Sequence, residues 1–148
     1  MEESKEITAI ESFRSGLNCS QSVVSAYAEE MNFDRNLALS ISCGFGGGMG
    51  RLQETCGAAT GAFMVMGIHY CRKYTGNKER KETTYAAIQR FSKEFTVLHG
   101  TMNCMELINV DLKTEEGHCK LKESNLSENV CEKCILDAIR ITEDILSS

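Results

Sequence analysis

Apolar residues recur three or four positions apart over most of this sequence, and no segment alternates strictly between apolar and polar residues as strands do. Proline, which interrupts helices, is absent from the chain. These two features predict an all-α fold. A length of 148 residues is typical of one domain, and no internal repeat or boundary is visible, so we expect a single-domain helical bundle of about five to six helices over residues 1–148.

Capping residues and glycines set the expected bounds of the helices. Asn18, Asp34 and Asn103 can each cap a following helix, and Gly16 and Gly100 can each end a preceding one. The longer helices are expected after Asn18, at 35–43, 53–74 and 79–99, and after a cap at Ser127 or Asn129, with shorter ones at 4–14 and 103–108. The glycine-rich segment 44–50 and the polar segment 109–126 are expected to be loops.

The charge pattern argues against two classes of partner. The net charge is −5 and no cluster of Lys and Arg is present, so we expect no nucleic-acid binding. The apolar region 57–70 is too short to span a bilayer and no basic amphipathic segment occurs, so we expect no membrane binding. Residues 1–6 lack the apolar core of a secretory signal, which predicts a cytoplasmic location.

Eight cysteines are an unusual number for such a chain. In a reducing cytosol they are not expected to form a disulfide framework, and a domain of this size does not need one. We therefore expect metal binding or redox chemistry for some of the thiols, and the role of a small buried apolar residue for two or three others.

Two of the cysteines follow a possible helix cap directly, in the pairs Asn18-Cys19 and Asn103-Cys104. A thiol in the first turn of a helix lies near unpaired amide groups and the positive end of the helix dipole. Both features favour the thiolate, which is the form that binds metals and attacks disulfides. We therefore predict lowered pKa values for Cys19 and Cys104.

Cys56 precedes a helical face of small residues, on which Gly57 and Gly61 lie four positions apart. Glycine costs a helix about 1 kcal/mol relative to alanine, so something is expected to approach this face closely. Two alternatives are open: another helix packs here, or a bulky inorganic group lies here with Cys56 at its edge.

Cys131 and Cys134 form a C-x-x-C pair early in the last expected helix, so both sulfurs project from one face. This spacing occurs in zinc, iron–sulfur and dithiol sites. Cys134 is also in register with the apolar stripe of its helix, and we expect it to be buried, which makes Cys131 the better candidate. Weaker candidates are Cys43, Cys71 and Cys119, the last of which follows His118 in the polar loop.

Several of these segments together resemble a family of redox-active proteins named C-GCAxxG-C-C. The matching segments are residues 18–23, 44–51, 54–62 and 95–107, together with Cys131. The family label has Gly-Cys-Ala where this chain has Cys56-Gly57-Ala58, so this position is matched by its context. The resemblance implies four functional cysteines, which are Cys19, Cys56, Cys104 and Cys131. Cys134 departs from the family pattern.

The same region is similar to the C-terminal part of split-Soret cytochrome c, which carries an iron–sulfur centre beside its haems. This similarity implies an iron–sulfur cluster here, without haem. The leading hypothesis is a small electron-transfer or redox-sensing protein that binds one cluster, a [2Fe–2S] centre, through those four thiolates and serves an unidentified redox partner protein.

Two other functions stay open at this point. One is a thiol–disulfide oxidoreductase without metal, and the other is a structural zinc site with four thiolate ligands. Whether the protein is an enzyme is also open, and an enzyme of this kind would be a thiol or iron–sulfur oxidoreductase. A second copy of the chain, in a homodimer, is a further possible partner.

Overall fold

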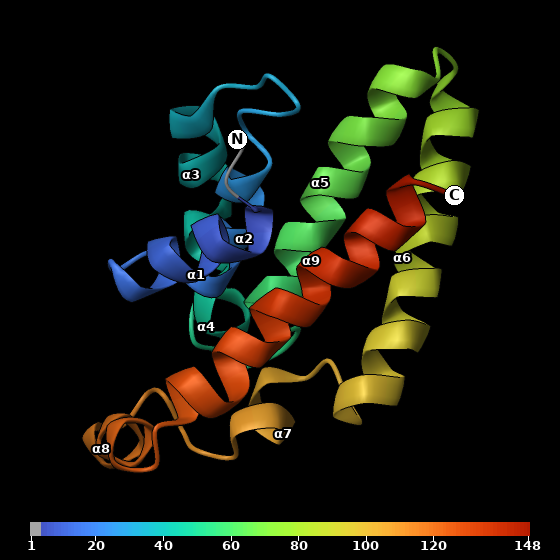
Figure 1. The fold of residues 1–148 in the computed structure, drawn as a ribbon. Coiled ribbons are helices and arrows are strands. Elements are labelled where there is room, and N and C mark those ends of the chain that lie inside the picture. The colour runs from blue at the N-terminus through green and yellow to red at the C-terminus, as the bar shows by residue number, and fades with distance from the viewer. Residues whose placement is uncertain (1–3) are drawn as a thin grey trace.

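The computed structural model describes residues 4–148, and the all-α prediction is confirmed for them (Figure 1). Most of the described chain is helical, and an isolated bridge pairs Thr55 with Asn103. The elements in chain order are α1 (Lys5–Arg14), α2 (Cys19–Ala26), α3 (Arg35–Ser42), η1 (Cys43–Phe45), α4 (Gly46–Met49), α5 (Gly57–Lys73), α6 (Asn77–His99), α7 (Cys104–Ile108), α8 (Glu115–Glu123), η2 (Ser127–Cys131) and α9 (Glu132–Leu146).

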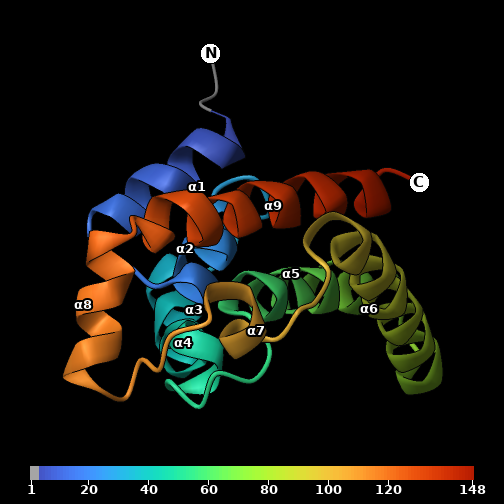
Figure 2. The same cartoon turned by 90° about the horizontal axis from the view of Figure 1, so that it is seen from below.

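The core lies between the three long helices α5, α6 and α9, which pack on one another, and α1 and α2 cover one end of this group (Figures 1 and 2). Phe91 and Phe95 of α6 stack in the centre, with ring centroids 5.5 Å apart. The predicted apolar stripe of α9 is confirmed, since its apolar side chains are buried against this core. Each large side chain buried in this way stabilises the fold by about 1.5–3 kcal/mol. Within residues 4–148, no helix combines the length and the apolarity needed to cross a bilayer.

The prediction of five to six helices was too low. α4 is a single turn in which Gly47 and Gly48 have left-handed backbone angles, and without it eight α-helices remain among residues 4–148. Seven of these eight correspond to the helical segments expected from the sequence, and the eighth is α8, which lies inside the expected polar loop. Local signals account for it: the Thr114 side chain accepts a hydrogen bond from the Gly117 amide, acidic residues occupy the first turn and lysines the last.

Three other helix predictions were wrong in detail. α5 begins at Gly57 rather than Gln53, because residues 54–56 pair with the segment around Asn103 instead. The last helix is capped by neither Ser127 nor Asn129 and begins with the wide turn η2. On α6, Tyr85 and Leu98 are exposed rather than in the core, because only the face with Phe91 and Phe95 meets α5 and α9.

The small-residue face of α5 is covered by α2, so the first of the two alternatives for Gly57 and Gly61, close packing of another helix, is confirmed. A Cβ atom on Gly61 would lie 2.8 Å from the Ser20 carbonyl oxygen, and one on Gly57 would lie 3.1 Å from the Cys19 Cβ. The two helices therefore touch along their backbones. This contact brings Cys19, at the start of α2, next to the start of α5.

Candidate functional site

Six of the eight cysteines line one cavity of about 640 Å³, at the end of the core where several helices begin. They include all four candidates from the sequence. These cysteines are Cys19, Cys43, Cys56, Cys104, Cys131 and Cys134. All eight cysteines lie within the described residues, and each is a free thiol.

Three of the four candidates, Cys19, Cys56 and Cys104, stand at the start of a helix, whereas Cys131 lies inside the last helix, where η2 joins α9. Cys19 is the first residue of α2, where Asn18 and Gln21 form a capping box, and Cys104 is the first residue of α7, capped by Asn103. Cys56 directly precedes α5, and Cys131 directly precedes α9. Both predicted asparagine caps are thus confirmed. Because helix N-termini carry partial positive charge, their convergence favours negative charge in the cavity.

A short backbone pairing joins two of these cysteines across the chain. The Cys56 amide donates to the Met102 carbonyl at 2.7 Å, and the Cys104 amide donates to the Glu54 carbonyl at 2.6 Å. The pairing surrounds the Thr55–Asn103 bridge. It fixes Cys56 and Cys104 next to each other although they are distant in the sequence.

The glycine-rich segment closes the cavity beside Cys104. Residues 47–51 all have φ between 65° and 69°, which makes a short left-handed turn that glycine tolerates far better than other residues. A Cβ atom on Gly48 would lie 2.6 Å from the Cys104 Cβ and 2.7 Å from the Gln53 Cα. Glycine at position 48 therefore lets the backbone lie directly on Cys104.

The thiols of the cavity form two close pairs. Cys19 donates a hydrogen bond to Cys131, which raises the pKa of Cys19 and, from the other side, lowers the pKa of Cys131. Cys134 similarly donates to Cys56 and has a raised pKa, whereas the pKa of Cys56 is lowered by this bond and by the amides at the start of α5. Each pair thus contains one thiol that favours the thiolate form.

The prediction of lowered pKa values for Cys19 and Cys104 was wrong. Cys19 acts as the donor to Cys131 and is buried, and both effects raise its pKa. Burial raises the pKa of Cys104 to about 12. The hydrogen bond to Cys131, followed by desolvation, therefore outweighs the helix dipole at Cys19, and desolvation outweighs it at Cys104.

His99 and Asp137 extend the thiol network outward, and no sequence pattern marks either as part of the site. The Cys134 sulfur lies 4.0 Å from Nδ1 of His99, and Nε2 of His99 lies 2.9 Å from a carboxylate oxygen of Asp137. Cys134 is fully buried, as predicted from its place in the apolar stripe. A spacing of 38 residues separates His99 from Asp137, so only the packing of α6 on α9 reveals their contact.

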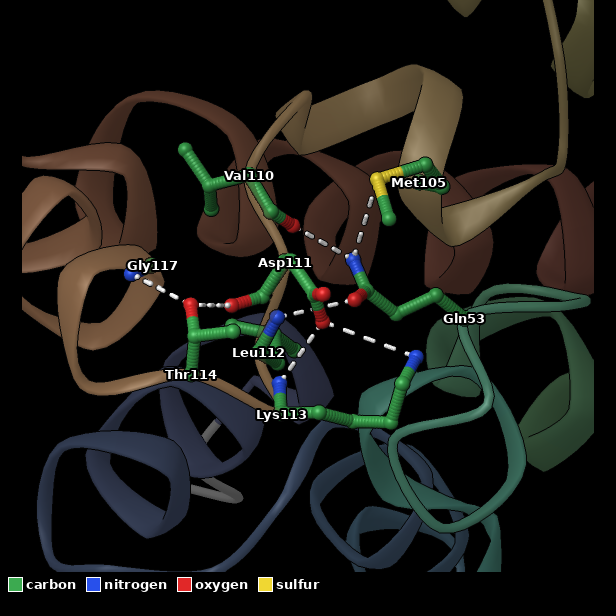
Figure 3. Close-up of polar contacts among 8 residues, drawn as sticks. All are labelled: Gln53, Met105, Val110, Asp111, Leu112, Lys113, Thr114 and Gly117. Atoms are coloured by element: carbon green, nitrogen blue, oxygen red, sulfur yellow. Dashed lines mark hydrogen bonds and ion pairs between the residues drawn. The ribbon is translucent and has the colours of Figure 1, made fainter.

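Gln53 is a further residue of the site that no sequence pattern marks, and Figure 3 shows the polar contacts of its side chain. Its buried side-chain amide donates to the Val110 carbonyl at 2.7 Å and accepts from the Leu112 amide at 2.8 Å. Thr114, two residues after Leu112 in the chain, caps α8. Gln53 thus attaches the segment before α8 to the glycine-rich turn, and α8 in turn supplies His118 and Leu121 to the cavity wall.

Gln53→Ala is expected to lower the free energy of unfolding by about 1–3 kcal/mol, because the buried Leu112 amide and the Val110 carbonyl lose their partner. Urea denaturation monitored by circular dichroism measures this loss. Glu54→Ala, at the exposed neighbouring position, is the control and should change stability by less than about 0.5 kcal/mol. Equal stability of Gln53→Ala and the wild type would contradict the role of this side chain.

The remaining cysteines divide as follows. Cys71 and Cys119 are exposed and lie outside the cavity, whereas Cys43 is exposed but borders it. Within residues 4–148, no three His, Cys, Asp or Glu side chains lie close enough together to hold one metal ion. The cavity thiols border a space and do not converge on a single point.

Comparison with known proteins gives a family match over most of the chain. A sequence model of the family described as "Putative redox-active protein (C_GCAxxG_C_C)" matches residues 17–145. An uncharacterized protein of Archaeoglobus fulgidus is 30% identical to this chain over 124 residues, which cover 78% of this chain and 82% of the relative. No solved structure gives a significant match.

Proposed function

The protein belongs to this C_GCAxxG_C_C family of redox-active proteins, and we propose that it is a small electron-transfer protein that binds an iron–sulfur cluster. The proposed ligands are the thiolates of Cys19, Cys56, Cys104 and Cys131, and the proposed cluster type is [2Fe–2S]. The observation that carries the proposal is that all four line one cavity, three of them at the start of a helix.

The residues present fit such a group in three respects. Four thiols are the ligand set that common clusters use. The helix starts around the cavity supply amide groups and partial positive charge, which stabilise thiolates and an anionic cluster. The four thiols border one cavity of about 640 Å³, which leaves room for a centre of several atoms.

A cluster bound here would supply one-electron transfer, and the chain would supply its setting. Cys56 and Cys131, whose pKa values are lowered, enter the thiolate form most readily. Burial of Cys56 and Cys104 excludes water from one side of the site. The Gln53 side chain donates toward Cys104 and to the carbonyl of Val110, in the segment before α8. It thereby positions the part of the cavity wall that this segment and α8 form.

A thiol–disulfide oxidoreductase is the second candidate, and the two close thiol pairs favour it. In this reaction Cys56 and Cys134 would form a disulfide, release two protons, and pass two electrons to an acceptor disulfide that becomes two thiols. His99, next to Cys134 and paired with Asp137, would accept one of these protons. The Cys19–Cys131 pair offers the same chemistry.

Anaerobic purification separates these candidates. We expect a coloured protein that contains iron and acid-labile sulfide in near-equal amounts, with a visible spectrum that bleaches on reduction. Metal analysis, sulfide assay and absorption spectra measure this. A colourless protein with stoichiometric zinc, even after reconstitution with iron and sulfide, would favour the structural site. A colourless, metal-free protein that cycles a Cys56–Cys134 or Cys19–Cys131 disulfide would favour the oxidoreductase.

A further inference from the structure

The cavity extends beyond its thiols into a region lined by apolar side chains. This apolar wall comes from α1, α7, the segment before α8, α8 itself and η2. Its residues are Phe13, Leu107, Ile108, Leu112, Leu121 and Val130. The total volume of about 640 Å³ lies within the range of about 300–1,000 Å³ that small-molecule sites occupy.

The charged side chains of the cavity wall are all basic. Arg51, in the left-handed turn, and His118, on α8, line the cavity, and among residues 4–148 no Asp or Glu does so. This is notable in a chain with 21 acidic and 16 basic residues. The wall therefore presents a guanidinium, and no carboxylate, beside the thiols.

Neither basic group is neutralised by the protein. Among the described residues, no carboxylate lies within 4.0 Å of the Arg51 guanidinium or the His118 ring, although the ion pairs elsewhere are numerous. Arg51 also has φ of 66°, a backbone conformation that costs a residue with a side chain about 1–2 kcal/mol. The fold thus keeps an unpaired guanidinium at the cavity in spite of a backbone cost.

We propose that this cavity binds a small organic anion, a carboxylate with a short apolar chain. The carboxylate pairs with Arg51, a geometry for which a guanidinium is suited, and His118, which also lines the cavity, offers a ring nitrogen for a further hydrogen bond. The apolar chain lies against Leu112, Leu121 and Val130. The proposal rests on the proposed redox function, because the bound anion would lie beside the thiols that carry it. Binding of the anion itself needs only the wall residues.

Isothermal titration of the anaerobically purified full chain with hexanoate tests the proposal. We expect saturable binding of hexanoate, and much weaker binding of acetate, which lacks the apolar chain, and of hexylamine, which carries the opposite charge. Arg51→Gln should weaken hexanoate binding about tenfold, since a charge-assisted hydrogen bond is lost. Lys81→Gln, an equal charge change on the exposed face of α6, is the control and should leave the affinity unchanged.

Two outcomes would overturn the proposal. One is the absence of saturable hexanoate binding. The other is an equal affinity of Arg51→Gln and Lys81→Gln for hexanoate, which would mean that the basic groups serve only to balance the charge of an anionic cluster. Iron and sulfide are measured in the same samples. Hexanoate binding by a protein that takes up no cluster would support this inference and contradict the proposed function. A cluster-loaded protein that does not bind hexanoate would support the proposed function and contradict this inference.

Discussion

Serine at Cys19, Cys56, Cys104 or Cys131 is expected to weaken cluster binding by at least about 10- to 100-fold, the loss typical even for residues that only support a metal ligand. Each substitution removes a thiolate from the cavity and leaves one iron without a sulfur ligand. The visible absorption and the iron content of anaerobic preparations should therefore collapse in all four variants.

Cysteines outside the cavity provide matched controls for this series. Cys71→Ser and Cys119→Ser make the same chemical change at exposed positions and should leave the spectrum unchanged. Cys134→Ser discriminates within the C-x-x-C pair, because Cys134 contacts Cys56 but is not a proposed ligand. If Cys134→Ser bleaches the protein and Cys131→Ser does not, the ligand assignment is wrong.

Gly61→Ala is expected to lower the free energy of unfolding by about 1–3 kcal/mol, although alanine is the better helix former. The new Cβ would lie 2.8 Å from the Ser20 carbonyl oxygen, which belongs to the backbone of α2 and cannot move away alone. The two helices must separate, and Cys19 must move away from the start of α5. Cluster loading should therefore fall together with stability.

Gly67→Ala is the control on the same helix. Nothing lies within 4 Å of a Cβ atom at position 67, so this variant should gain up to about 1 kcal/mol from helix propensity. Urea denaturation of both variants measures the difference. A Gly61→Ala protein as stable as Gly67→Ala would show that α2 and α5 do not depend on this close contact.

The sequence predicted the parts of the site that depend on neighbouring residues. The caps at Asn18 and Asn103 were found because a capping side chain bonds to an amide only two or three residues away. The burial of Cys134 followed from the period of its helix. The gathering of Cys19, Cys56, Cys104 and Cys131 in one cavity agrees with the family resemblance, whereas their role as ligands stays a prediction.

Features that depend on contacts between distant segments could not be predicted in this way. Gln53 has no pattern that marks it, because its partners lie more than fifty residues later in the chain. The pKa values of Cys19 and Cys104 went against prediction because contacts of the whole fold outweighed the local dipole: the hydrogen bond to Cys131 at Cys19, and burial at Cys104. α8, in contrast, depends on a local signal. Its cap at Thr114 is present in the sequence, but the polar composition of the segment around it favours a loop.

The position of α9 has a consequence for how the protein is made. A ribosome adds residues in order from the N-terminus, so Cys19, Cys56 and Cys104 leave it before Cys131 and before the helix that completes the core. Until α9 docks, these three thiols have no finished wall around them and are open to oxidants. A group held by all four thiols would therefore be bound only after α9 has been made and has docked, and a truncated chain that lacks α9 would offer its thiols to the surrounding solution rather than to a common site.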